Sequence, residues 1–271
     1  MKRIRVYGDS FAAHHHQPPH SWTHLLGQLC NLPVINNAIA GGSTEYAIKK
    51  LIDDIDSIED DIVIFVSSTP GRLHFSHQQQ ERPETAAQYL HTPQDNGKDH
   101  SWYYQNKKHI EWWMVNRDHQ LNRINHEAYM HLIRSIARSK PNSVFVIIPN
   151  SDHCLHISGG VDPTNFLITK TCLFQISENE NVKEFPTWKD FTKYTKWDLR
   201  INHLTNPNLE ILASLIFDCI NKHDMSGLGY DKFNKHFLTP IRTKKQYEEY
   251  VSLGYLSHTP WNDQELSKVM S

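Results

Sequence analysis

The sequence has little net charge, because basic and acidic side chains almost cancel. Lys and Arg together number 28 and Asp and Glu number 30, which gives a formal net charge of −2 with neutral histidines. A chain this close to neutral has no general electrostatic attraction to a nucleic acid or to an anionic membrane surface. We therefore expect neither a nucleic acid nor a membrane as a partner.

Long hydrophobic runs are absent as well. Ile62–Val66 is one of the longest uninterrupted runs, and it is far shorter than the roughly 20 residues of a membrane-spanning helix. Only a few apolar residues precede the polar Gly8-Asp9-Ser10, so the start of the sequence holds no hydrophobic segment of a signal peptide. These two absences predict a cytoplasmic protein.

The sequence has only four cysteines, and no two of them lie close together in a motif. Cys30, Cys154, Cys172 and Cys219 are widely scattered and form no CxxC motif. Disulfide frameworks and structural zinc sites both depend on regularly spaced cysteines. We expect buried thiols instead, since an unpaired cysteine usually behaves as a small hydrophobic residue.

What the sequence does contain is an alternation of strand and helix patterns. Residues 4–7, 32–37 and 62–66 predict strands, and apolar residues at helical spacing predict helices over 21–29 and from about 43 to 58. The run at 62–66 does not alternate, which is typical of a strand buried on both faces of a parallel sheet. This order predicts an α/β fold, a three-layer α/β/α sandwich of the flavodoxin-like kind with a mostly parallel central sheet.

The second half of the chain continues the alternation with one ambiguous stretch. Residues 116–139 predict a helix with Leu121, Ile124, Ala128, Leu132, Ser135 and Ile136 near one face, and residues 144–149 predict a fourth buried strand. Periodicity does not decide between strand and helix over 150–195. Asn206 as a cap with Pro207 in the first turn predicts the start of another helix.

Two segments fit no regular pattern. Residues 76–115 predict an insertion, and its aromatic part at Trp102–Trp113 suits core packing, a wall of a substrate pocket or a contact with a partner. Residues 225–271 hold no second long core pattern. We therefore predict a main α/β domain over 1–224 and a C-terminal appendage over 225–271 that packs on it.

Gly8-Asp9-Ser10 directly follows the first predicted strand. A strand that ends in a glycine-containing turn can present a serine nucleophile at the carboxyl edge of a sheet, where open α/β sheets bind ligands. Gly41 and Gly42 lie between the second strand and its helix, where backbone N–H groups at a helix start can hold negative charge.

These segments resemble the SGNH hydrolases, also called GDSL esterases. The resemblance rests on Gly8-Asp9-Ser10-Phe11, on Ser21-Trp22-x-x-Leu25-Leu26, on Asn36-x-Ala38-Ile39-Ala40-Gly41, and on His203 before the last helix. It implies an SGNH-type α/β fold and a serine esterase without a cofactor or metal. Ser10 would be the nucleophile, His203 the base, and the N–H groups of Ser10 and Gly41 part of the oxyanion hole.

Two positions depart from the family pattern. Ser67-Ser68-Thr69-Pro70-Gly71 stands where the family has Gly-x-Asn-Asp, so Thr69 or Ser68 would have to replace the asparagine as oxyanion donor. Arg200 stands three residues before His203 where the family has Asp, while Asp198 stands five before it. Either Asp198 or a backbone carbonyl would orient the imidazole, or Ser10 and His203 would act as a dyad.

Two other classes of function compete with the esterase. The chain has 19 histidines, including His14-His15-His16, His20, His24 and His153-Cys154-x-His156, but none has the spacing of a closed metal site. A binding or structural protein that keeps the fold without activity is favoured by the two departures. For the esterase we expect acyl or acetyl esters, with O-acetylated carbohydrate among the candidates, and His14 and Arg72 at the substrate.

Overall fold

The structure is a computed structural model of the 271-residue chain. It describes residues 1–13, 21–39, 42–68, 119–150, 162–183, 204–234 and 236–238, with 245, 248–249 and 252–253. Contacts divide the chain into two compact units, the first formed by Met1–His15 and Asn31–Lys170 and the second by His16–Cys30 and Thr171–Ser271.

The first unit is built on a parallel sheet. Its strands are β1 (Ile4–Tyr7), β2 (Val34–Asn36), β3 (Ile62–Ser67), β4 (Val144–Pro149) and β5 (Phe166–Ile168). They pair side by side in the order β2-β1-β3-β4-β5, and each described pairing is parallel. This order is that of the doubly wound flavodoxin-like folds. The predicted α/β class with a mostly parallel central sheet is therefore confirmed.

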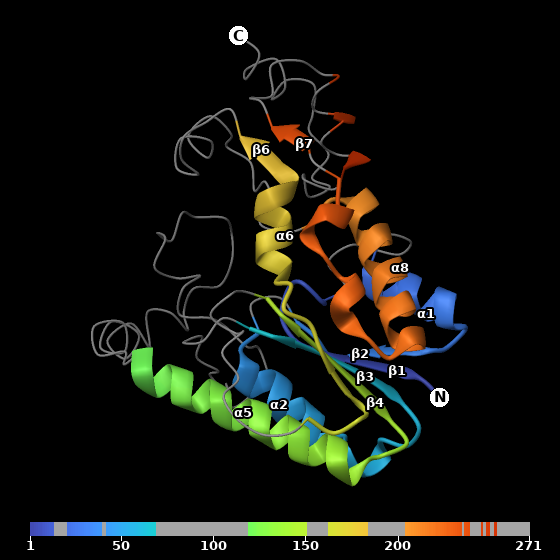
Figure 1. The fold of residues 1–271 in the computed structure, drawn as a ribbon, viewed down its shortest axis with the longest axis vertical. Coiled ribbons are helices and arrows are strands. Elements are labelled where there is room, and N and C mark those ends of the chain that lie inside the picture. The colour runs from blue at the N-terminus through green and yellow to red at the C-terminus, as the bar shows by residue number, and fades with distance from the viewer. Residues whose placement is uncertain are drawn as a thin grey trace, which may run out of the picture. The chain divides into compact units, whose positions relative to one another are not determined.

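Two helices of this unit pack on one face of the sheet (Figure 1). They are α2 (Thr44–Asp53), which is followed by the short 3-10 helix η1 (Ile55–Ser57), and the long α5 (His119–Ser139). The core between them and the sheet is formed by Tyr7, Ala47, Ile48, Leu51, Val63, Phe65, Met130, Ile133, Ala137, Phe145 and Ile147. Every residue of β1, β3 and β4 is buried. The apolar runs at 62–66 and 144–149 predict this for β3 and β4, whereas β1 is buried although it carries Arg5.

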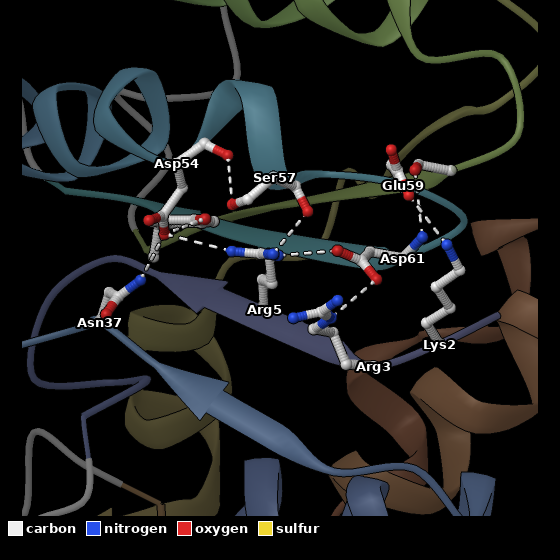
Figure 2. A network of polar contacts seen from close by, with 10 residues as sticks. Lys2, Arg3, Arg5, Asn37, Asp54, Ser57, Glu59 and Asp61 are labelled. Atoms are coloured by element: carbon white, nitrogen blue, oxygen red, sulfur yellow. Dashed lines mark hydrogen bonds and ion pairs between the residues drawn. The ribbon is translucent and has the colours of Figure 1, made fainter.

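A network of polar contacts ties β1 to the end of α2 (Figure 2). Arg5 of β1 donates from Nε to Asp61 Oδ2 at 2.7 Å and from Nη2 to the Ser57 carbonyl at 2.7 Å. Asp54, which caps α2, accepts hydrogen bonds at Oδ2 from Tyr7 Oη (2.7 Å) and Asn37 Nδ2 (2.9 Å). Arg5 and Asp61 are both buried. Arg5 supplies a donor to Asp61 Oδ2, and Arg3 Nε lies 3.3 Å from Oδ1, so two positive charges compensate the buried carboxylate.

The second unit contains α1 (Trp22–Cys30), α6 (Leu173–Glu180) and α8 (Asn206–Lys222), and α1 and α8 lie side by side. It also contains the 3-10 helices η3 (Met225–Gly227) and η4 (Tyr230–Lys232) and a parallel pair of short strands, β6 (Asn181–Lys183) and β7 (His236–Leu238). The predicted stripe of α8 is buried at Leu209, Leu212, Ala213 and Ile216. The cap of this helix is Thr205, one residue before the predicted Asn206.

Two further expectations concerned buried cysteine thiols and the lack of a membrane-spanning helix. Cys172 and Cys219 are buried free thiols and Cys30 is half-buried, and burial raises the pKa of both the Cys30 and the Cys219 thiol. Cys154 lies outside the described residues. Within the described part of the chain, no helix has both the length and the apolar character needed to cross a membrane.

Candidate active site

The carboxyl ends of the sheet strands bring several polar segments to one edge. Gly8-Asp9-Ser10 follows β1, Asn37 follows β2, Ser68 follows β3 and Asn150 follows β4. The strand order reverses between β1 and β3. In doubly wound sheets ligands bind outside the strand ends at this reversal point, so Ser10 follows one of the two strands that define the binding position.

Gly8 has a backbone conformation and a packing environment that demand glycine. Its φ is +154°, and a Cβ built on it would lie 2.8 Å from both the Cβ and the carbonyl oxygen of Val66. Real Cβ atoms do not approach other atoms this closely, and L side chains rarely adopt such a φ. The glycine therefore lets the end of β1 turn directly against β3.

Asp9 holds the turn that follows. Its carboxylate is completely buried and accepts hydrogen bonds from the Phe11 amide at Oδ1 (3.0 Å) and from Asn150 Nδ2 at Oδ2 (2.6 Å). Its carbonyl accepts from the amides of Ala12 (3.0 Å) and Ala13 (2.9 Å). These contacts confirm the expectation that Asp9 fixes the turn.

Ser10 is half-buried in the middle of this turn. No described residue forms a hydrogen bond with its hydroxyl. Asp9 precedes Ser10 and accepts hydrogen bonds from the amides of Phe11, Ala12 and Ala13, which follow it, so the backbone of Ser10 is held while its hydroxyl has no bond to the described scaffold. Such a hydroxyl is available to a base and to a substrate.

The far side of the turn is held from β2. Asn36 donates from Nδ2 to the Ala12 carbonyl at 2.7 Å, and its Oδ1 accepts from the Ala38 amide at 2.9 Å. Asn36 belongs to the segment that carries the family resemblance, and the structure gives it this local role. Asn36 in β2 and Asn150 after β4 thus hold the turn from the two strands that flank the β1–β3 pair.

The start of α2 lies at the same edge. The Ile39 amide donates to the Gly8 carbonyl (3.2 Å), and a Cβ on Gly42 would lie only 3.0 Å from that carbonyl oxygen. Ser43 caps the helix by accepting from the Tyr46 amide at 3.2 Å. The N-terminal end of a helix carries partial positive charge, so its position beside Gly8 favours negative charge near Ser10.

Ser68 and Thr44 join this helix start to the end of β3. The Thr44 hydroxyl donates to the Ser68 carbonyl and accepts from the Ser68 amide, each at 3.1 Å. Ser68 is buried. Its position is thereby fixed at the end of β3.

Among the predicted site residues, Ser10 is the one that the structure describes. The others, which are His14, Gly41, Thr69, Arg72, Asp198 and His203, lie outside the described residues, as does the predicted insertion at 76–115. Asn150 was not predicted as a site residue. The available signal was a polar residue directly after a buried parallel strand, at the edge where Ser10 was expected.

The described residues contain no group of three or more His, Cys, Asp or Glu side chains that could hold a metal ion. His24, one of the histidines of the metal alternative, lies on α1 with its Nε2 at 3.1 Å from Gln28 Nε2. The remaining histidines of that alternative, at 14–16, 20, 153 and 156, lie outside the described residues.

Comparison with known proteins yields structural neighbours but no relative by sequence. No family model matches the sequence, and no curated protein matches it. The chain is similar to the crystal structure of the lipase/acylhydrolase from Enterococcus faecalis, with 17% sequence identity and a TM-score of 0.26. The match covers 56% of this chain and 59% of that one, which is less than two thirds of the neighbour's length.

Proposed function

We propose that this protein is a serine ester hydrolase of the SGNH type, with Ser10 as nucleophile and His203 as base. The observation that carries the proposal is the turn after β1. It lies where the strand order reverses, Asp9 fixes its backbone, and the half-buried Ser10 hydroxyl has no hydrogen bond to a described residue. The resemblance of residues 8–11 and 36–41 to the SGNH motifs supports the same role.

The proposed reaction is acyl transfer through the serine. His203 takes the Ser10 proton, the alkoxide attacks the ester carbonyl, and the imidazolium then gives its proton to the departing alcohol. Water, deprotonated by the same imidazole, releases the acid and restores Ser10. The N–H groups of Ser10 and Gly41 stabilise the oxyanion, and Asp198 orients the imidazole.

Thr69 is the proposed third oxyanion donor. It occupies the position of the family's asparagine, directly after Ser68, whose backbone is bonded by the Thr44 hydroxyl. Loss of one oxyanion donor lowers a rate by about a hundredfold to a thousandfold. A threonine that replaces the amide incompletely therefore gives a slower enzyme, not an inactive one.

The proposed substrates are acyl or acetyl esters, and the aromatic segment at Trp102–Trp113 makes O-acetylated carbohydrate one candidate beside small or lipid esters. Aromatic rings present flat apolar faces, on which the apolar face of a sugar ring can stack. His14 and Arg72 are the proposed substrate-binding residues, because each follows closely after one of the strands β1 and β3.

The alternative is a non-catalytic protein with the same fold that binds a ligand at this edge. Two features favour it, namely threonine at position 69 and arginine at position 200 where the family carries asparagine and aspartate. In that case the turn at Asp9 would serve as scaffold, since fold alone does not determine function.

Labelling with a fluorophosphonate probe tests the proposal. We expect one adduct per chain in the wild-type protein, located on Ser10 by peptide mass analysis, and none in Ser10→Ala. Ser214→Ala, which removes an exposed hydroxyl on α8, is the control and should label as the wild type does. Folded wild-type protein without an adduct would exclude the esterase and leave the binding protein.

Hydrolysis assays then define the substrate. A panel of acyl chain lengths and acetylated sugars should show a preference that disappears in Ser10→Ala. Activity that a chelator abolishes, while Ser10→Ala retains it, would instead establish the metal-dependent alternative.

A further inference from the structure

Asn150 makes a contact that the proposed chemistry has not yet used. Its Nδ2 donates to Asp9 Oδ2 at 2.6 Å, and the two residues are 141 positions apart in sequence. Asn150 follows β4, which is separated from β1 by β3. The amide therefore reaches over the end of one strand to the carboxylate beside Ser10.

The backbone of Asn150 is held in place by strand pairing. The Asn150 amide N–H donates to the Ser67 carbonyl at 3.0 Å, which continues the pairing of β3 with β4 by one residue. Asn150 is 2% exposed and Asp9 is 0% exposed. Hydrogen bonds between groups this well buried are strongly favoured, because a donor or acceptor that loses its partner there cannot bond to water.

The two oxygens of the Asp9 carboxylate accept hydrogen bonds from different parts of the chain. Oδ1 accepts from the Phe11 amide, one residue beyond Ser10, while Oδ2 accepts from Asn150. Rotation of the carboxylate away from Asn150 would also move Oδ1 and release the Phe11 amide. The orientation of the turn around Ser10 thus depends on what holds Oδ2.

We infer that Asn150 is a positioning residue for Ser10, acting through the Asp9 carboxylate. This inference rests on the proposed function of Ser10. An asparagine suits the task because it is a neutral donor with a fixed amide plane. It holds a carboxylate without a second charge at the edge where an oxyanion is to be stabilised.

Asn150→Ala and Asn165→Ala form a matched pair for the test. Asn165 is also a buried asparagine of the first unit, but its Nδ2 donates to the carbonyls of Ala137, Lys140 and Ser143, before the start of β4 and β5. It therefore lies at the edge opposite Ser10. Both variants should lower the unfolding temperature, because both leave buried groups without a partner.

The rate of fluorophosphonate labelling, corrected for the folded fraction, distinguishes the effect of Asn150→Ala from that of Asn165→Ala. Asn150→Ala should label Ser10 at least about tenfold more slowly than Asn165→Ala, which corresponds to one lost hydrogen bond in the transition state. The exchange variant Asp9→Asn/Asn150→Asp restores an amide–carboxylate pair with the roles reversed. It should label faster than Asn150→Ala at equal folded fraction, whereas labelling as slow as in Asn150→Ala would show that the pair does not position Ser10.

Hydrogen exchange supplies a readout that needs no activity. The amides of Phe11, Ala12 and Ala13 all donate to Asp9 and should exchange faster in Asn150→Ala than in Asn165→Ala. If the wild-type protein is not labelled, the proposed function is wrong. Hydrogen exchange would then still test whether Asn150 holds the turn around Ser10. Equal exchange in the two variants, or equal labelling rates in an active protein, would overturn the positioning role.

Discussion

At the scale of single residues, the molecule places acceptors where several donors converge. Asp54 Oδ2 lies within hydrogen-bonding distance of Tyr7 Oη and Asn37 Nδ2 and 3.5 Å from Arg5 Nη1. The Tyr7 side chain is fully buried. Burial, and next its hydrogen bond to Asp54, raise the pKa of Tyr7 well above the ordinary value for tyrosine.

This raised pKa predicts a loss of stability in alkaline solution. Below pH of about 10 the Tyr7 hydroxyl is protonated in both states. Above it, the unfolded chain ionises while the folded chain keeps the proton, so the free energy of unfolding falls as pH rises. Tyr7→Phe should be less stable than the wild type by about 1 kcal/mol at neutral pH.

The measurement is urea denaturation of the wild type and Tyr7→Phe at pH 7 and at about pH 10.5. The stability difference between them should shrink at the higher pH, because ionisation of Tyr7 stabilises the unfolded wild-type chain, and the phenylalanine variant has no such group to ionise. An unchanged difference would mean that Tyr7 ionises equally in both states.

At the residue scale, the turn that holds Asp9 and Ser10 could be predicted from sequence because a local pattern indicates it, while the nucleophile role of Ser10 stays a prediction. A strand, a glycine and a serine within ten residues predict a turn at a sheet edge, and the structure has this turn. Asn150 has no such pattern around it. Its partner is fixed by the pairing of β1 with β3 and of β3 with β4, which single-residue patterns do not encode.

At the scale of elements, α5 differs from its sequence pattern. The predicted apolar face includes Leu121, Ile124 and Leu132, yet these side chains are 53%, 51% and 38% exposed. The face that packs into the core carries Met130, Ile133, Ile136 and Ala137, of which the predicted face included Ile136. It also carries the buried His126 and Arg134, so hydrophobicity alone does not identify it.

Two isoleucines on this helix allow a direct comparison. Ile133→Ala should lower the free energy of unfolding by about 2–5 kcal/mol, because Ile133 is fully buried and leaves a cavity. Ile124→Ala should change it by less than about 0.5 kcal/mol. Denaturant unfolding measures both, and a large loss in Ile124→Ala would show that this face is covered in solution.

The strands were easier to predict than the helices for a physical reason. β3 and β4 are buried on both faces, so nearly every position selects an apolar residue and the run is unmistakable. The three residues of β5 and the eight of α6 lie in the stretch where periodicity gave no decision. Elements this short complete too few repeats to display a period.

At the scale of the whole molecule, the segment after α8 is bonded to the helices before it. Asn208, fully buried on α8, donates from Nδ2 to the Asn234 carbonyl (2.9 Å) and accepts at Oδ1 from the Asn234 amide (2.8 Å). The Thr171 hydroxyl donates to the Leu228 carbonyl, and the Cys172 amide donates to Tyr230 Oη at 3.0 Å.

These contacts predict what removal of residues 225–271, the proposed appendage, would do. A chain that ends at Asp224 loses both partners of the Asn208 side chain, and each buried polar group left unpaired costs about 1–3 kcal/mol. We expect the unfolding temperature to fall by at least several degrees, at about 2–4 °C per kcal/mol. Thermal unfolding followed by circular dichroism measures it.

Asn208→Ala is the smaller companion change and should reproduce part of the loss. If the shortened chain unfolds at the temperature of the full chain, residues 225–271 are an appendage without influence on the helices. The boundary after residue 224 was inferred from the absence of a long apolar pattern. Contacts made through backbone carbonyls and amides leave no such pattern in a sequence.

The bond between Asp9 and Asn150 also sets an order of events during synthesis. Ribosomes add about 5–20 residues per second, so the 141 residues between the two partners take roughly 7–30 s to make. β1 likewise waits for β3 before it is paired on both sides. Ser10 is therefore made well before the residue that completes the hydrogen bonding of its turn.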